Sequence, residues 1–231
     1  MPVAAVVLLA MLMLACGAPR DPEKTLERVQ KQHVMRVGLV ESPPWVIRTG
    51  GEPAGVEPEL ARRFARTLGA TPQWFWGADQ PHMEALERFE LDLVVADLDA
   101  KSPWNKKVGL TRPYFKEQVA VGVPPGANPP SSLDGLNVAV EPGDVTAAYV
   151  GKQGALATPQ TDLSHAAGPA AAPTWRLQQL GFTLTKFQLF EKQHVMAVPP
   201  GENAWLKKLT EFLFAQQQNI RPLLQSSEAP Q

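Results

Sequence analysis

Several acidic and aromatic residues stand directly after apolar runs of the sequence. Glu41 and Trp45 follow "RVGLV", while Asp99, Ser102 and Trp104 follow "LDLVVADL". Carboxylates attract cations, and indole rings offer flat surfaces to apolar or cationic groups. The pattern predicts recognition of a small molecule. The alternative for each residue is ordinary loop chemistry, and for Trp104 it is packing at a domain edge.

A third run, "LNVAVE", is followed by "PGDVTAAY", which contains Gly143, Asp144 and Thr146. The glycine lets the backbone approach a ligand closely. Residues 144–146 would present helix-start amides and a hydroxyl to an anionic or polar group. Trp175 follows a fourth run, "GPAAAP". In open α/β sheets ligands sit beyond the carboxyl ends of strands, so all four places are predicted binding positions.

The sequence shows no arrangement typical of an enzyme or a metalloprotein. No nucleophile–base pair and no Gly-rich phosphate loop is apparent. The four histidines, at positions 33, 82, 165 and 194, lack metal-ligand spacing. We therefore expect a binding protein with no metal and no cofactor. The alternative is an enzyme in which Glu41 or Asp99 acts as acid or base.

The amino-acid composition limits the kinds of partner that the chain could bind. The 231 residues are 44% hydrophobic and 19% charged, with a formal net charge of -1. No block of like charges occurs, which argues against a nucleic-acid surface or a polybasic membrane footprint. A chain of this length forms one large domain or two small ones.

The N-terminal segment resembles a bacterial lipoprotein signal. Residues 3–15 are continuously apolar, too short to span a membrane, and lead into "LMLACG" with Cys16, the only cysteine. We expect residues 1–15 to be removed and Cys16 to carry a lipid that anchors the chain to a membrane outside the cytoplasm. The alternative is a core segment with a buried thiol. Residues 16–34 are predicted to form a tether, with the fold beginning near Met35.

Hydrophobic periodicity predicts two α/β lobes. Residues 35–98 give the order β-α-β-α-β, which implies a parallel sheet, and "GVEPELARRFARTLGA" has the spacing of an amphipathic helix. The turn "VPPG" occurs twice, as expected for two strands that pass between lobes. We predict that lobe one comprises residues 35–117 and 194–231, and lobe two residues 118–193.

The chain resembles the family-three extracytoplasmic solute-binding proteins, which deliver polar amino acids and similar solutes to ABC importers. The likeness rests on the stretches "MRVGLVESPPWVIRTGGEPAGVEPELARRFARTLGA", "MEALERFELDLVVADL", "SPWNKKVGLTRPYF", "SSLDGLNVAVEPGDVTA" and "HVMAVPPGENAWLKKL". It implies the type II periplasmic-binding-protein fold, with two lobes joined by hinge strands. It also implies a monomer that captures a solute between its lobes and presents it to a permease.

The chain departs from this family in its expected ligand contacts. Amino-acid receptors of the family carry Thr-Pro-x-Arg after the third strand, whose Arg grips an α-carboxylate, whereas residues 102–105 read Ser-Pro-Trp-Asn. Lys106 or Lys107 could supply charge but no planar fork. Family members also carry a carboxylate in the second lobe that binds the ammonium group of the ligand. The corresponding place in this chain holds Pro173 and Trp175 instead.

These departures predict a changed ligand. Trp45, Trp104 and Trp175 would build an aromatic-lined site, with Glu41 and Asp99 facing the cation of a polar or amine-containing solute. One alternative is a receptor that has lost transport and binds a protein partner. The other is an enzyme on the same fold, since some relatives act as dehydratases or carry a transglycosylase attachment.

Overall fold

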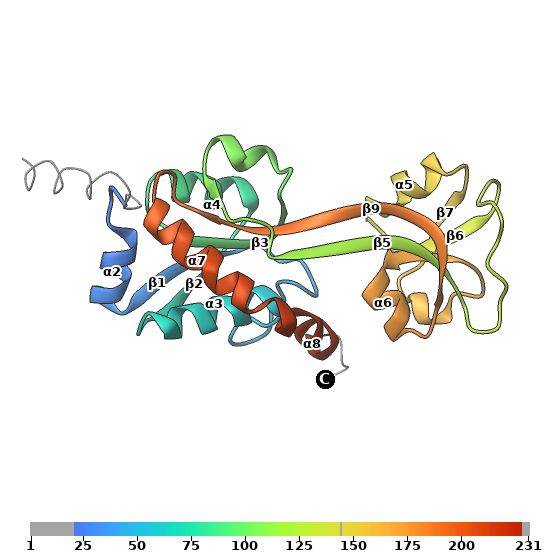
Figure 1. The fold of residues 1–231 in the computed structure, drawn as a ribbon, viewed down its shortest axis with the longest axis horizontal. Coiled ribbons are helices and arrows are strands. Elements are labelled where there is room, and N and C mark those ends of the chain that lie inside the picture. The colour runs from blue at the N-terminus through green and yellow to red at the C-terminus, as the bar shows by residue number, and fades with distance from the viewer. Residues whose placement is uncertain (1–20, 144, 228–231) are drawn as a thin grey trace, which may run out of the picture. The chain divides into compact units, whose positions relative to one another are not determined.

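The computed structural model of the protein describes residues 21–143 and 145–227 (Figure 1). The predictions for Cys16 and Asp144 fall outside these residues. The chain divides into two compact units, which are described separately. Unit 1 comprises residues 21–97, 103–112 and 196–216, and unit 2 comprises residues 98–102, 113–195 and 217–227.

Unit 1 is built on a parallel sheet with β1 in the middle. Its helices are α2 (Thr25–Gln32), α3 (Val56–Thr67), α4 (Asp79–Glu87) and α7 (Asn203–Ala215), with the 3₁₀ turn η1 (Pro103–Lys106). Its strands are β1 (Val34–Leu39), β2 (Thr71–Trp76), β4 (Gly109–Leu110) and the first part of β3 (Leu93–Asp99). β1 pairs in parallel with both β2 and β3, so the predicted β-α-β-α-β order is confirmed.

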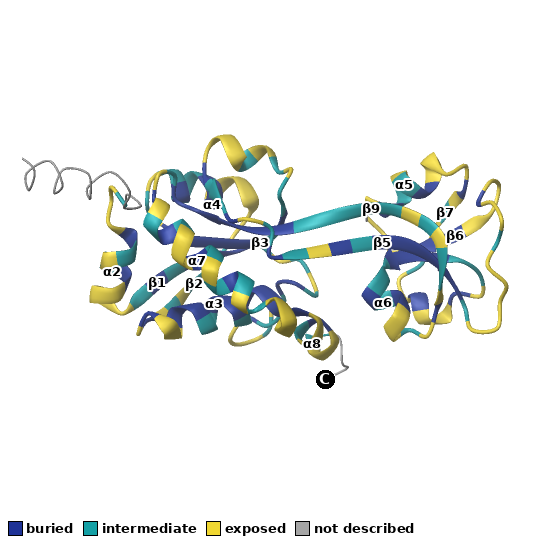
Figure 2. Ribbon diagram, in the orientation of Figure 1, coloured by how far each residue is buried: buried dark blue, intermediate teal, exposed yellow. Residues whose placement is uncertain are grey.

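Helix periodicity explains the core of unit 1. In α3, Leu60 and Phe64 lie four residues apart and are fully buried, so one face of the helix packs on the sheet. The Phe64 ring lies 5.1 Å, centroid to centroid, from that of Trp205 in α7. In Figure 2, β1 and β3 are largely buried, whereas the helices of unit 1 expose residues on their outer faces.

Unit 2 combines a small parallel sheet with two long antiparallel strands. Its strands are β5 (Phe115–Val123), β6 (Asn137–Val140), β7 (Leu156–Pro159), β8 (Ala170–Pro173) and most of β9 (Thr183–Val198). Its helices are α5 (Thr146–Lys152), α6 (Thr174–Gln179), α8 (Gln217–Ser227) and the 3₁₀ turn η2 (Leu163–His165). β6 pairs in parallel with β7 and β8, while β5 runs antiparallel to β8 and β9. Sequence periodicity missed β7, because this four-residue strand is largely exposed.

The units differ from the predicted lobes at several boundaries. Unit 2 also includes residues 98–102, 113–117, 194–195 and 217–227. The short stretch before Gln118 belongs with the rest of β5 because the strand begins at Phe115 without interruption. At the C-terminus, α7 ends at Ala215 and a separate helix, α8, begins at Gln217.

The expected tether is replaced in its second half by a docked helix. Within residues 16–34, α2 buries Val29 completely. The Glu202 carboxylate accepts hydrogen bonds of 2.8 Å from the backbone N–H groups of Glu23 and Thr25. The Asp21 carboxylate in turn accepts from the backbone N–H of Leu26 at 2.8 Å and of Trp205 at 3.3 Å. These bonds satisfy the N–H groups that begin both helices, and they hold α2 against α7.

One buried carboxylate joins α2, β1, β3 and α7. The Asp92 side chain is completely buried and forms ion pairs with Arg28 and with Arg36, the latter at 2.7 Å. It also accepts the backbone N–H of Arg36 at 2.7 Å. The backbone carbonyl of Asp92 accepts the indole N–H of Trp205 at 2.7 Å. The segment before β3 is therefore fixed to three other elements.

Replacing Asp92 by Ala is expected to lower the free energy of unfolding by about 3 kcal/mol. The change leaves Arg36 and Arg28 without their buried counter-charge and removes an acceptor for a backbone N–H. Urea unfolding followed by tryptophan fluorescence measures the loss. Glu90→Ala, which removes an exposed partner of Arg88, is the control and should cost less than about 0.5 kcal/mol. Equal stability of the two variants would contradict the role of Asp92.

The carboxyls of Asp21 and Glu202 predict a pH dependence. Burial, followed by the hydrogen bond to Glu202, raises the pKa of Asp21 above its usual 3.8. Burial pushes the pKa of Glu202 upward, but hydrogen bonds from Asp21 and from the backbone of Glu23 and Thr25 outweigh it and lower this pKa.

Asp21→Asn tests this arrangement. A raised folded pKa means that the contribution of Asp21 is complete below pH 3.8 and is lost as the pH rises through the raised value. An amide does not titrate, so the stability of Asp21→Asn relative to wild type should increase from pH 3.8 to pH 7. Urea unfolding across this range measures it, with Asp79→Asn at an exposed site as control. A pH-independent difference between Asp21→Asn and wild type would contradict the prediction.

Candidate functional site

Polar side chains gather in unit 1 where β1 and β3 approach their carboxyl ends. The Ser42 hydroxyl donates to the Asp97 carboxylate at 3.2 Å. The backbone N–H of Asp97 donates to Glu57 Oε2 at 3.1 Å. Ser42, Glu57 and Asp97 are called the unit 1 polar cluster below. Two carboxylates and a hydroxyl in this place suit a cation or a hydrogen-bond donor.

Local structure explains why this cluster is held in place. Glu57 is fully buried in the first turn of α3, where the positive end of the helix dipole stabilises its charge. Asp97 has a φ of 53°, in the left-handed region that few residues other than glycine adopt. Aspartate tolerates this conformation better than most residues. Asp97 adopts this conformation within β3, and its N–H donates to Glu57 there.

The two predicted residues that follow β1 have different surroundings in the structure, since one is exposed and the other is buried. Glu41 is exposed and lies 3.6 Å from Arg48 in an ion pair. Trp45 is only 2% exposed and belongs to the core, so its predicted place in a ligand-binding wall is not what the unit shows. Its backbone carbonyl accepts the N–H of Glu57 at 3.0 Å. A Cβ at Gly55 would lie 2.6 Å from the same carbonyl oxygen, which explains a glycine there with a φ of 100°. Trp45 thus supports α3 from within.

The predicted residues at the end of β3 and just beyond it are divided between the two units. Asp99 and Ser102 belong to unit 2, and Trp104 belongs to η1 of unit 1. The Asp99 carboxylate accepts the backbone N–H of Lys101 at 2.6 Å and of Gln193 in β9 at 3.2 Å. It therefore fastens a turn to β9. Trp104 is half-buried, and the Lys107 ammonium lies 5.9 Å from the centre of its ring.

In unit 2, Gly143 and Thr146 both follow β6. Gly143 is exposed and has a φ of 79°. Thr146 begins α5 and is completely buried, so its side chain points into unit 2 rather than to the surface. Gly143 is thus accessible, whereas Thr146 lies in the interior at the start of α5.

Trp175 participates in a buried group that the sequence did not predict. Its indole N–H donates to Glu117 Oε1 in β5 at 2.8 Å. The other carboxylate oxygen of Glu117 lies 3.5 Å from His194 Nε2 in β9. Glu117 is 6% exposed and His194 is fully buried. Glu117, Trp175 and His194 are called the unit 2 polar cluster below, and they join β5, β9 and α6.

The exposed residues Asp162, Ser164 and His165 do not have the arrangement of a hydrolytic triad. Asp162 and Ser164 lie 2.8 Å and 3.1 Å from the same atom, His165 Nδ1. A hydrolytic triad places its Ser and Asp on opposite ring nitrogens, so these exposed residues form a turn instead. Across residues 21–143 and 145–227, no group of three or more His, Cys, Asp or Glu side chains could hold a metal ion.

Sequence reasoning missed five residues of the two clusters, namely Ser42, Glu57, Asp97, Glu117 and His194. Asp97 left one signal, since it interrupts an apolar run where a strand would continue. Glu57 stands at a predicted helix start, where an acidic residue is ordinary and gives no sign of a binding site. Glu117 and His194 gave no signal, because 58 residues separate Glu117 from Trp175 and the β5–β9 pairing brings His194 nearby.

Curated relatives match about half of the chain. Membrane-bound lytic murein transglycosylase F of Vibrio cholerae is 31% identical over 119 residues, which are 48% of this chain and 22% of that protein. The protein of the same name from Idiomarina loihiensis is 32% identical over 120 residues, 49% of this chain and 26% of that protein. The matched chain thus spans about a quarter or less of these relatives.

Solved structures show the same fold. An ancestral cationic amino acid solute-binding protein has a TM-score of 0.73 and 18% identity, covering 88% of this chain and 99% of that one. Arginine-bound, truncated ArgBP from T. maritima has a TM-score of 0.53 and 19% identity, covering 81% and 98%. The BvgS periplasmic domain of B. pertussis has a TM-score of 0.68 and 14% identity, covering 92% and 48%. The predicted α/β fold of the two-lobe periplasmic binding proteins is confirmed.

The family model for the bacterial extracellular solute-binding proteins, family 3, matches residues 35–222. This range contains both polar clusters and every described residue of the predicted site. The chain therefore belongs to family 3 of the bacterial extracellular solute-binding proteins.

Proposed function

We propose that the protein is an extracytoplasmic receptor that captures a small polar or amine-containing solute and delivers it to an ABC permease. The observation that supports it most is the unit 1 polar cluster, which places Asp97 and Ser42 at the carboxyl ends of two parallel strands in a family of solute-binding proteins. Asp97 and the nearby exposed Glu41 favour a positively charged group.

The missing guanidinium supports a ligand other than a free α-amino acid. Residues 102–105 provide a half-buried Trp104 and no arginine. At the end of β8 stands Pro173, and the nearby Trp175 is already bonded to Glu117. An α-carboxylate would lack its bidentate partner, whereas an amine or cation would meet carboxylates.

We propose that Cys16 carries a lipid and that the protein acts at a membrane surface outside the cytoplasm. Within the described part of the chain, no helix is long and apolar enough to cross a membrane. The proposal therefore rests on "LMLACG" and on the extracellular character of the family.

A second candidate function is a receptor without transport that signals to a protein partner. It is favoured by the length of the similar proteins, because this chain covers 22% of the Vibrio transglycosylase and 48% of the BvgS periplasmic domain. In such proteins the matched region is only one segment of a longer chain. Transport of a bound solute by cells with and without the protein distinguishes the two functions. We propose no enzymatic activity, since the matched region is a minor part of the transglycosylases.

The twenty standard amino acids are expected to bind no tighter than the millimolar range. Each charge-assisted hydrogen bond that is lost costs roughly 1.5–3 kcal/mol, so losing the two bonds of an arginine fork costs about 3–6 kcal/mol. This loss weakens a micromolar ligand by roughly 10²- to 10⁴-fold, to about the millimolar range. Calorimetry with the twenty amino acids and with simple diamines, on the chain without its lipid, measures the difference. Micromolar binding of any standard amino acid would contradict the proposed ligand class.

Asp97→Asn should weaken the binding of the ligand. The ligand to use is a diamine that binds the wild-type protein, or a solute that mass spectrometry identifies after its release from the purified protein. The change removes the negative charge but keeps an acceptor for Ser42. Asp99→Asn is expected to act in the same direction through its turn, and Asp134→Asn at an exposed site is the control. Trp45→Ala is not a suitable test, because loss of this buried ring would lower stability. Full affinity in Asp97→Asn would show that the cluster does not bind the solute.

Replacing Cys16 by Ser is expected to release the protein from membranes. Serine offers no thiol for the lipid, so the chain should move from the membrane fraction to the soluble fraction. The intact mass of the mature wild-type protein should show the added lipid and the loss of residues 1–15. A Cys16→Ser variant that stays in the membrane fraction would contradict the lipid anchor.

A further inference from the structure

The helix α2 is firmly attached to the rest of unit 1. Two anchors hold it, namely the ion pair of Arg28 with the buried Asp92 and the bonds of the Glu202 carboxylate to the start of the helix. Val29 adds a fully buried apolar contact. Asp21 itself is fixed to α7 through the N–H of Trp205. The body of the protein thus begins at Asp21, fourteen residues earlier than Met35.

This attachment shortens the spacer that a lipid on Cys16 would have. A chain spans at most about 3.6 Å per residue, so the five steps from Cys16 to Asp21 reach no further than about 18 Å. A free tether from Cys16 to Met35 would reach almost four times as far, roughly 68 Å. The docked helix therefore confines the body to the neighbourhood of the lipid.

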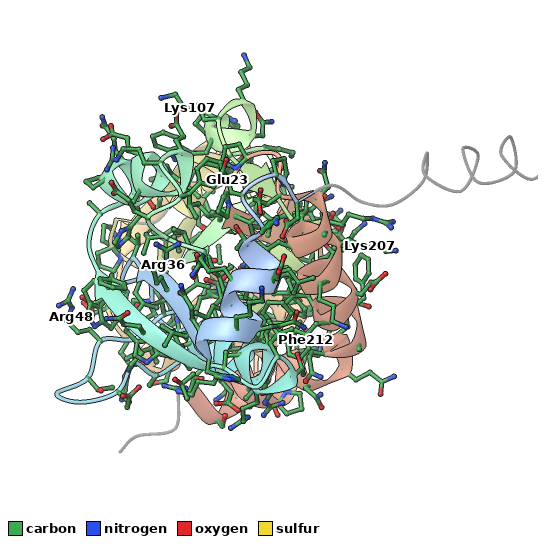
Figure 3. The ribbon with its side chains drawn as sticks, turned by 90° about the vertical axis from the view of Figure 1, so that its left-hand side faces the viewer. Glu23, Arg36, Arg48, Lys107, Lys207 and Phe212 are labelled. Carbon is green, nitrogen blue, oxygen red and sulfur yellow. The ribbon has the colours of Figure 1, made fainter. Side chains whose placement is uncertain are left out.

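The same contacts define which face of unit 1 the spacer leaves from. Asp21 lies where the N-terminal ends of α2 and α7 meet. Figure 3 looks onto this side of unit 1, with Glu23 near the start of α2 and Lys207 on α7. Exposed residues near this junction include Pro22, Glu23, Lys24, Asn203, Lys207 and Lys208. All of these except Pro22 are polar, which is compatible with lipid headgroups.

We propose that this face of unit 1 lies against the phospholipid headgroups of the membrane that holds the lipid. The proposal rests on the proposed lipidation of Cys16. It goes beyond that modification because it assigns the orientation of unit 1 to the docking of α2. A short spacer keeps the receptor at the membrane surface, where the permease also is, and so raises the effective concentration of the two partners.

Site-specific labels along α7 test the orientation in the full, lipidated chain. Since Cys16 is the only native cysteine, Asn203→Cys and Ala215→Cys each provide a single thiol for a fluorophore. Both positions are exposed, and twelve residues separate them on the same helix. The proteins are placed in phosphatidylcholine–phosphatidylglycerol vesicles that contain a nitroxide-headgroup lipid. The label at position 203 should be quenched about twofold more strongly, because about 18 Å of helix separates the labels.

A spacer variant provides the matched control. Inserting about twenty Gly and Ser residues between positions 18 and 19 adds a flexible segment of roughly 25 Å root-mean-square length. It should bring quenching at the two positions to the same low level without removing the protein from the vesicles. Equal quenching at the two positions with the native spacer would overturn the orientation while leaving the anchor intact. Failure of the protein to bind vesicles, with no lipid in its mass, would instead refute the proposed lipidation.

Discussion

The buried carboxylate of Asp92 is the constraint on which unit 1 depends. A charge without solvent is costly unless it is paired and fully hydrogen-bonded, and Asp92 meets this demand with Arg36, Arg28 and a backbone N–H. Because its partners come from α2 and β1, and its own carbonyl binds Trp205 of α7, four elements must assemble together. The order of β1 and β3 in the sheet, and thus the place of Ser42 and Asp97, follows from this assembly.

Both units use buried acids to position their polar groups. In unit 1, Glu57 accepts the N–H of Asp97 and so fixes the part of β3 that carries the Asp97 carboxylate. In unit 2, Glu117 connects the indole of Trp175 with His194 and so joins α6 to two long strands. Rigidly held polar groups suit the binding of a small solute, because preorganised groups lose less entropy when a ligand binds.

The N-terminal region connects the folded part of the chain to the proposed lipid anchor. Two carboxylates, Asp21 and Glu202, satisfy the first N–H groups of α2 and α7, so the helix that follows the proposed anchor is part of the body. A family member with a long free tether could move far from its lipid. In this chain the docked helix removes most of that freedom. The contacts that stabilise unit 1 would therefore also limit how far the protein lies from the proposed lipid anchor.

The sequence by itself determined the features that depend on local pattern. Hydrophobic periodicity predicted the β-α-β-α-β order of residues 35–98. The resemblance to family three further implied that residues 102–105 lack the arginine of its amino-acid receptors. Only the tertiary structure decided which side chains are buried and which groups meet. It buried Trp45, gave Asp99 a partner 94 residues away, and brought Glu202 to the start of α2 across 177 residues. The reason is physical, since periodicity reports the faces of single elements, whereas such pairings form only when distant elements pack together.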